Sequence, residues 1–194
     1  MKLKNNKNIY EILNKEVDKL KKENPYSIKD IHILDYHYGN RSPIASSRGM
    51  EIGLNMSEDI VSMAKIYWAT IDSVCFGTKN IIDTAINKGY KINSIIVCGG
   101  AGKNELFMRE LADICQYNIY IPGHEESVVF GSAILASVAS GEYKNYKEAL
   151  SKMNKKAKLI KPNKTIKKYY ESKYKIYLEL YKDKLKYEKM MSNF

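Results

Sequence analysis

Paired glycines and an asparagine stand where a predicted strand gives way to a predicted helix. The β-branched run Ile95–Val97 ends just before Gly99 and Gly100, and a helical pattern begins at Asn104. Glycine has no Cβ, so a flat ligand can lie against the main chain, and an asparagine amide can both donate and accept hydrogen bonds. Glycines that follow a strand and open into a helix are where open α/β sheets bind nucleotides. The segment therefore predicts a nucleotide-binding turn.

Two common phosphate-binding motifs fail to fit this turn. A P-loop has a glycine five residues before its Gly-Lys pair and a Ser or Thr after it, whereas Val97 precedes Gly102–Lys103 and Asn104 follows. The Rossmann pattern G-x-G-x-x-G lacks its third glycine here. If the turn binds a nucleotide, it is predicted to hold the adenosine end and not the phosphates. The alternative is a tight turn that only joins strand to helix.

The surrounding pattern predicts an α/β fold with the order strand, helix, strand, helix. Asn118–Ile121 is the second predicted strand, Pro122–Gly123 ends it, and a helix follows from about Ser127 to a stop at Gly141. Small residues on this helix predict unusually close packing against a neighbour, and they are Gly131, Ser132, Ala133 and Ala136. Gly131 alternatively lies near the nucleotide crevice.

Two further helices are predicted as scaffold. Apolar residues recur at helical spacing between Ser57, which is predicted to begin the first helix, and Gly89, which ends it. Trp68 and Phe76 lie among apolar neighbours in this helix and are interpreted as core residues, not as a ligand-binding pair. A second amphipathic helix is predicted over residues 9–22.

The net charge of +10 comes from the C-terminal part of the chain. From Lys144 onward there are sixteen lysines and five acidic residues. Such a basic, tyrosine-rich segment could indicate a nucleic acid or an anionic membrane surface as a partner. Apolar residues at intervals of three and four between Ile166 and Leu185 instead predict a docked amphipathic helix with lysines on its outer face. We therefore predict no specific nucleic-acid partner and no membrane partner, and expect only weak, nonspecific polyanion binding.

Composition indicates a globular protein, with 44% hydrophobic residues. The sequence has no run of about 18 apolar residues and no apolar stretch behind the first lysines, so neither a membrane span nor a secretory signal is predicted. Cys75, Cys98 and Cys115 lack metal-ligand spacing, so no metal site is predicted. They are interpreted as reduced thiols, which predicts a cytoplasmic location.

Four ordered motifs resemble one protein family. The stretches C-G-G-A-G-K-N-E-L-F-M-R-E-L-A-D and E-E-S-V-V-F-G-S-A-I-L-A resemble the C-terminal domain of the FGGY carbohydrate kinases. Upstream, D-Y-H-Y-G-N-R-S-P-I-A is similar to the family's G-x-R-S/T-P segment, and downstream K-K-Y-Y-E-S-K-Y-K-I-Y-L-E-L is similar to a terminal helix. The matches predict a helix and linker over residues 1–29, a kinase C-terminal domain over 30–162, and a basic Tyr/Lys-rich helix packed on it over 163–194.

The resemblance implies an ATP-dependent sugar kinase with the actin-like, ribonuclease H-like fold of sugar kinases, hexokinase and Hsp70, whose two domains close over a cleft. It implies transfer of the γ-phosphate of ATP to a sugar hydroxyl. The G-N-R-S-P form points to a D-ribulokinase-like branch, which converts D-ribulose to D-ribulose 5-phosphate. Two alternatives stay open: a nucleotide-binding pseudokinase or interaction module that acts with a partner, and a basic nucleic-acid-binding protein.

The same resemblance assigns candidate site residues. Carried over by motif, Gly100 and Asn104 contact the adenine and ribose of ATP, and Gly99 and Ala101 support them as backbone. Arg41 is a candidate cleft-lining residue, whose guanidinium either pairs with a phosphate or carboxylate or forms a salt bridge that pins its loop. Mg²⁺ is implied through ATP, with its ligands outside this chain.

Departures from the family are equally informative. Its general-base carboxylate, its hydroxyl-bearing phosphate loops and its N-terminal domain have no counterpart here, so no catalytic residue is predicted and the chain alone is expected to be inactive. Asp35 and His37 are weaker alternatives for a base. The expected partners are ATP, a pentulose in the full kinase, and either the missing N-terminal kinase half or a second copy. Without the early strands, the remaining sheet should expose an unpaired edge.

Overall fold

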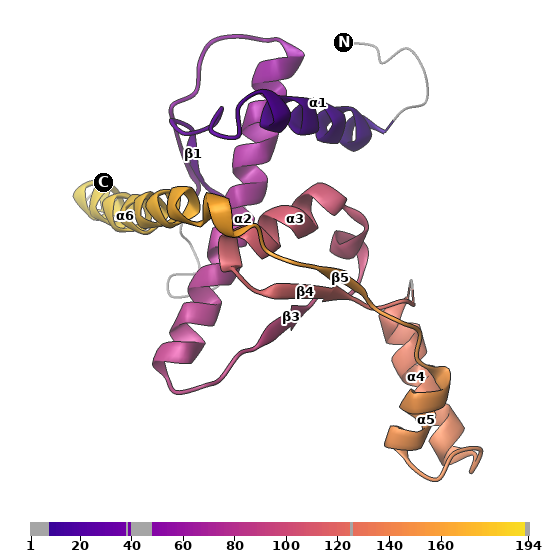
Figure 1. Cartoon of the computed structure of the whole chain (residues 1–194). Coiled ribbons are helices and arrows are strands. Elements are labelled where there is room, and N and C mark those ends of the chain that lie inside the picture. Colours follow the sequence, from indigo (N-terminus) through magenta and orange to yellow (C-terminus); the bar gives the residue numbers. More distant parts are fainter. Residues whose placement is uncertain (1–7, 38, 40–47, 125, 193–194) are drawn as a thin grey trace. The chain divides into compact units, whose positions relative to one another are not determined.

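A computed structural model describes residues 8–37, 39, 48–124 and 126–192 of the 194-residue chain (Figure 1). The chain divides into two compact units. Unit 1 comprises Met1–Thr84 and Thr165–Phe194, and unit 2 comprises Ala85–Lys164.

Unit 1 is mainly helical. In chain order it contains α1 (Ile9–Glu23), β1 (His32–Leu34), β2 (Met50–Ile52), most of α2 (Ile60–Asn87), the end of a short 3₁₀ turn (Lys164–Ile166) and α6 (Lys167–Met191). The two strands pair antiparallel, with Ile33 opposite Glu51. Strand β1 also packs against α6, so the first and last parts of the chain share one core.

Helix α1 forms where the amphipathic pattern predicted it. The Asn8 side chain accepts a hydrogen bond from the Tyr10 backbone N–H at 3.1 Å, which satisfies one of the unpaired donors at the helix start. Leu13, Val17 and Leu20 form the buried face. The prediction of an amphipathic helix here is confirmed.

Helix α2 begins three residues later than predicted. Its first turn is capped by Asp59, whose carboxylate accepts a hydrogen bond from the Ser62 backbone N–H at 2.7 Å, and Ser57 instead donates its hydroxyl to the same carboxylate. At the other end Gly89 adopts a positive φ of 91° and stops the helix, as predicted. Trp68 is fully buried, which confirms that it is a core residue.

An aromatic cluster joins α2 to α6. The Phe76 ring stacks on Tyr174 with centroids 5.9 Å apart and also contacts Tyr170 and Tyr177. All four side chains are buried, so the tyrosine stripe predicted for the C-terminal helix is a packing surface. Helix α6 therefore packs against β1 and α2 within unit 1.

Unit 2 is an α/β unit. It contains β3 (Ser94–Ile96), the 3₁₀ turn η1 (Gly100–Lys103), α3 (Glu105–Cys115), β4 (Asn118–Ile121), α4 (Ser127–Ala139), α5 (Tyr146–Met153) and β5 (Lys158–Ile160). The sheet order is β3-β4-β5, with β3 parallel to β4 and β5 antiparallel to it. The predicted strand–helix–strand–helix order is confirmed.

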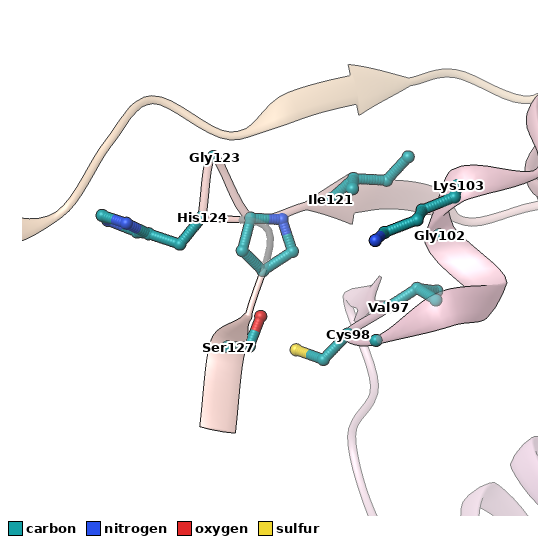
Figure 2. A pocket seen from close by; sticks show the side chains of 10 residues that line it. Val97, Cys98, Gly102, Lys103, Ile121, Gly123, His124 and Ser127 are labelled. Carbon is teal, nitrogen blue, oxygen red and sulfur yellow. The ribbon is translucent and has the colours of Figure 1, made fainter. Parts of the chain in front are cut away.

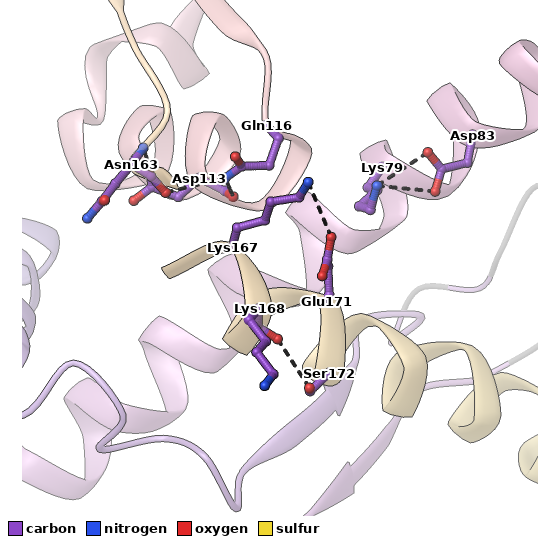
Figure 3. A network of polar contacts seen from close by, with 9 residues as sticks. All are labelled: Lys79, Asp83, Asp113, Gln116, Asn163, Lys167, Lys168, Glu171 and Ser172. Atoms are coloured by element: carbon purple, nitrogen blue, oxygen red, sulfur yellow. Dashed lines mark hydrogen bonds and ion pairs between the residues drawn. The ribbon is translucent and has the colours of Figure 1, made fainter. Parts of the chain in front are cut away.

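Strand register assigns the side chains of this sheet to two faces. Ile95, Ile119 and Ile160 lie opposite one another on one face, and Ile119 is completely buried where α3 packs against β4 and β5. Polar contacts tie the chain after β5 to α3, since Asp113 accepts the Asn163 backbone N–H at 2.7 Å (Figure 3). One side of the sheet is therefore a core.

Helix α4 differs from its prediction. A Cβ placed on Gly131 would meet no atom within 4 Å, so the expected close approach of a neighbour at the small-residue face is not found. The helix packs against α5, and Ile134 is its one buried residue. Among the described residues no helix is long and apolar enough to cross a membrane.

Candidate functional site

The predicted turn joins β3 to α3 through a glycine-dependent bend. Val97 continues the parallel ladder by donating its N–H to Tyr120 O at 3.0 Å, and Gly99 then adopts φ 83° and ψ −162°. This conformation is essentially restricted to glycine. A Cβ on Gly99 or Gly100 would meet no atom within 4 Å, so open space borders the main chain at both positions.

Asn104 links the turn to the helix. Its side-chain oxygen accepts the Phe107 backbone N–H at 3.3 Å, and its own backbone N–H donates to Ala101 O at 3.1 Å. Asn104 is therefore the N-cap of α3, a position that favours asparagine. The cap holds the amide at the junction between the glycine turn and the helix.

A pocket of about 310 Å³ lies at the carboxyl ends of β3 and β4, where open α/β sheets place their ligands (Figure 2). Figure 2 shows the Lys103 ammonium, the Cys98 thiol and the Ser127 hydroxyl directed into the same space. The full lining is Val97, Cys98, Gly99, Gly102, Lys103, Ile121, Pro122, Gly123, His124 and Ser127.

Only one of the four predicted nucleotide-binding residues lines this pocket. Gly99 lines it, whereas Gly100, Ala101 and Asn104 belong to the same turn without lining it. Lys103, for which no role was predicted, also lines the pocket. The turn is thus assembled in one place, with its exposed glycines beside the pocket.

Sequence reasoning missed the contributions of His124 and Ser127. Both follow β4, and the carboxyl ends of parallel strands meet at one edge of a sheet. Their position in the sequence, directly after the Pro122–Gly123 end of the predicted strand, could have indicated that they lie at this edge. Their roles in the pocket wall depend on the parallel pairing of β3 with β4, which no local motif shows.

Charged and polar contacts surround the pocket. The Lys103 ammonium lies 4.0 Å from a Glu126 carboxylate oxygen, and both side chains are largely exposed. The His124 ring stacks on Phe130 with centroids 3.6 Å apart, and its Nε2 accepts the Lys155 backbone N–H at 3.1 Å. These contacts fix the histidine against the connection between α5 and β5, while the lysine supplies positive charge at the opening.

The remaining candidates belong to the other unit or fall outside the described residues. Arg41 lies outside the described residues. Asp35 accepts a hydrogen bond from the Ser73 hydroxyl at 2.9 Å, and His37 Nε2 lies 3.6 Å from a Glu51 carboxylate oxygen, both within unit 1. Within the described part of the chain, no three His, Cys, Asp or Glu side chains are grouped so that they could hold a metal ion.

Comparison with known proteins identifies the family. Residues 2–140 match the model of the FGGY family of carbohydrate kinases, C-terminal domain. The chain belongs to the FGGY family of carbohydrate kinases. An FGGY carbohydrate kinase domain-containing protein from Xenopus laevis is 38% identical over 187 residues, which cover 94% of this chain and 34% of that relative. A D-ribulokinase from Saccharomyces cerevisiae is 40% identical over 112 residues, covering 56% of this chain and 16% of that relative.

Solved kinase structures share the fold of this FGGY domain. A gluconate kinase from Lactobacillus acidophilus superposes with a TM-score of 0.69 at 22% identity, over 86% of this chain and 33% of that one. A glycerol kinase from Plasmodium falciparum, solved with ADP, has a TM-score of 0.66 at 16% identity over 87% and 33%. The chain therefore spans about a third of the length of the Xenopus laevis relative and of both solved kinases.

The residues of the turn fit an adenine nucleotide on two observations. A Cβ at Gly99 or Gly100 would meet no other atom within 4 Å, so a planar base could approach the main chain at both positions. The adjoining pocket has a mixed lining, apolar at Val97, Ile121 and Pro122 and cationic at Lys103. Such a site can hold a flat ring against backbone while its polar rim selects orientation.

Proposed function

We propose that this chain is the adenosine-binding part of an ATP-dependent carbohydrate kinase with the actin-like, ribonuclease H-like fold. One observation carries the proposal: a glycine-only bend at Gly99 opens onto a pocket at the carboxyl ends of two parallel strands. Family membership supports it, because the matched domain belongs to carbohydrate kinases.

Each residue has a physical task in this proposal. Gly99 and Gly100 let the base approach the main chain, Ala101 continues that backbone surface, and Asn104 presents an amide at the start of α3. ATP supplies the transferable phosphoryl group, and Mg²⁺ accompanies it. Because phosphoryl transfer depends on positioning and charge stabilisation, groups that hold the phosphates and the sugar must complete the site from the rest of the kinase.

D-Ribulose is the proposed sugar, with D-ribulose 5-phosphate as the product. The support is the G-N-R-S-P stretch of the sequence together with the partial match to a D-ribulokinase. The chain by itself is expected to bind ATP without phosphorylating D-ribulose. Phosphorylation of D-ribulose by the isolated chain that disappears in an Asn104→Ala variant would place a general base within these residues. It would refute the proposal that the catalytic groups lie in the rest of the kinase.

Cys98 offers a direct test of nucleotide binding. It is exposed in the pocket wall, while Cys75 and Cys115 are buried, so a maleimide added to the native chain should modify Cys98 first. We expect ATP, ADP and adenosine to slow this modification at saturating concentration, and tripolyphosphate to leave it unchanged. Mass spectrometry of the labelled peptides measures the rate.

Two glycine variants make the test specific. Gly100→Val places a side chain in the open space beside the glycine turn, and Gly131→Val places one in open space on helix α4, outside the turn. We expect Gly100→Val to abolish protection by adenosine and Gly131→Val to preserve it. Equal protection by tripolyphosphate, or none by any adenine compound, would contradict the adenosine proposal.

A second candidate function is a nucleotide-binding pseudokinase or interaction module that acts with a partner. It predicts the same Cys98 protection but no phosphorylation of D-ribulose in a complex that contains the remaining kinase residues. A specific nucleic-acid function has only the lysine content in its favour.

A further inference from the structure

The turn after β4, residues 122–127, forms one wall of the candidate pocket. Together with Ile121 at the end of β4 it supplies five of the ten lining residues. In Figure 2 this wall, with Gly123 and Ser127, lies across the pocket from Lys103. Whatever holds the turn after β4 in place therefore sets the shape of the pocket.

The antiparallel ladder between β4 and β5 ends where this turn begins. Its last pair is Ile121 with Lys158, and the same register continued along the chain would pair His124 with Lys155. At that position His124 Nε2 accepts the Lys155 backbone N–H at 3.1 Å. The imidazole thus takes the place of a backbone carbonyl where the two segments no longer pair as strands.

Close packing holds the imidazole in this position. A Cβ on Gly123 would come within 2.7 Å of Lys155 Cβ and Lys156 O, so the turn lies directly against the connection between α5 and β5. The His124 ring stacks on Phe130 of α4, with centroids 3.6 Å apart and planes 13° apart. One ring face is therefore held by α4, and the Nε2 edge is held by the connection.

The bond to Lys155 requires one protonation state of His124. An imidazole that accepts a hydrogen bond at Nε2 is neutral and carries its proton on Nδ1. Protonation turns Nε2 into a donor, which would face the Lys155 N–H donor and lose the bond. Histidine is the side chain whose charge ordinarily changes between pH 5 and 8. His124 therefore ties the turn to the connection only in its neutral form.

The charged groups around His124 offer no simple replacement for that bond. The titratable residues of the surrounding elements are Lys155, Lys156 and Lys158 on the connection and β5, Cys98 and Lys103 across the pocket, Glu105 at the start of α3, and Glu126 at the N-cap of α4. Glu125 lies outside the described residues. Glu126 lies 4.0 Å from the Lys103 ammonium and Glu105 pairs with Lys158, so each of these two carboxylates already has a lysine partner.

We propose that neutral His124 is a positioning residue of the nucleotide pocket, and that adenosine binding is consequently linked to loss of a proton from His124. Its bond to Lys155 holds Pro122 and Ser127 in the wall, so protonation loosens the side of the pocket that faces the glycine turn. A ligand that prefers the neutral form must in turn disfavour protonation. The inference rests on the proposed function, because it concerns the site at which adenosine is proposed to bind.

Calorimetric titration of the full chain with adenosine tests this link, because adenosine carries no titrating phosphate. We expect the affinity to fall about tenfold from pH 7.5 to pH 5.5, which corresponds to the loss of one hydrogen bond. His124→Gln presents an oxygen that can accept the Lys155 N–H and does not titrate, so its affinity should be close to that of the wild-type chain at pH 7.5 and independent of pH. His124→Phe keeps a ring on Phe130 without the acceptor, so its affinity should be low at both pH values.

His32→Gln is the matched control, because His32 is a histidine of unit 1 outside the pocket lining. It should retain the pH dependence of the wild-type chain. Proton NMR of the three histidines adds a readout that a purely structural role would not change. Adenosine should move the titration midpoint of His124 to lower pH and leave that of His32 unchanged.

The outcomes separate this inference from the proposed function. Equal affinity at both pH values, a pH dependence that persists in His124→Gln, or normal affinity in His124→Phe would each overturn the inference while adenosine binding stands. Absence of adenosine binding at both pH values would refute the proposed function and the inference together.

Discussion

At the scale of single residues, Asn104 has two tasks that a substitution can separate. Its amide oxygen caps α3, and its position beside the glycine turn makes it the proposed contact for the nucleoside. Aspartate keeps the capping oxygens but loses the NH₂ donor, whereas alanine loses both. The pair Asn104→Asp and Asn104→Ala therefore distinguishes helix stability from ligand recognition.

We expect Asn104→Ala to lower the free energy of unfolding by about 1 kcal/mol, and Asn104→Asp to leave it nearly unchanged. Both variants should lose at least tenfold in adenosine affinity, measured by protection of Cys98 from a maleimide. Urea unfolding supplies the stability values. Adenosine affinity that is normal in Asn104→Asp would show that the amide donors do not read the ligand.

The environment of His32 in unit 1 predicts that the free energy of unfolding depends on pH. Burial and the nearby Lys173 ammonium lower the pKa of His32 below its usual 6.5, with Asp30 opposing weakly. The Lys173 ammonium is itself fixed, since it donates to Ile28 O at 2.7 Å and to Ile31 O at 2.9 Å. The folded protein thus resists protonating His32 more than the unfolded chain does.

The contribution of neutral His32 to the free energy of unfolding is fully present above pH 6.5. It decreases as the pH falls below 6.5, because the unfolded chain then binds a proton at His32 more readily than the folded protein does. His32→Gln cannot titrate. We expect the wild-type chain to lose more unfolding free energy than His32→Gln between pH 7.5 and 5.5, measured by urea unfolding. A parallel decline in both proteins would rule out His32 as the cause.

At the scale of elements, the turn between β3 and α3 was the most predictable part of the molecule. Its glycines, its capping asparagine and the β-branched run before it act locally, so their pattern is visible in the sequence. Helix α4 was less predictable. Its small residues suggested close packing, but the described structure leaves Gly131 without a neighbour. Packing partners are set by tertiary arrangement, which local composition does not encode.

Two adjacent glycines allow a matched test of that turn. Gly99 has a positive φ of 83°, and Gly100 does not share this conformation, while neither would bring a Cβ near another atom. We expect Gly99→Ala to cost about 1–3 kcal/mol of unfolding free energy through backbone strain. Gly100→Ala should cost much less. Thermal unfolding compares them, and equal losses would contradict the strain argument.

Only part of the candidate pocket could be predicted from the sequence. Gly99 belongs to a strand–turn–helix pattern that is visible in the sequence, and it lines the pocket; its contact with a nucleotide stays a prediction. His124 and Ser127 come from the next strand and helix, so their approach to Lys103 depends on the parallel ladder. Nonlocal pairing of this kind becomes visible only in the fold.

At the scale of the whole molecule, the excess of positive charge lies in the sequence from Lys144 onward. Several of those lysines make exposed ion pairs, such as Lys182 with Glu179 at 2.7 Å, and such pairs contribute little to stability. We expect binding to heparin and to DNA of any sequence at low salt. Affinity should fall by at least tenfold between about 50 and 200 mM salt, and sequence-selective binding in a gel-shift assay would contradict this expectation.

Unit 1 is built from both ends of the chain, and this fixes an order of events during synthesis. Lys173 bonds carbonyl groups of Ile28 and Ile31, and the aromatic cluster of α2 is completed by tyrosines of α6. Everything in unit 2 is translated between these partners. Unit 1 can therefore close only after α6 has been synthesised, and the apolar faces of α1 and α2 stay exposed until then. Early termination before α6 would leave a chain that chaperones and proteases treat as unfolded.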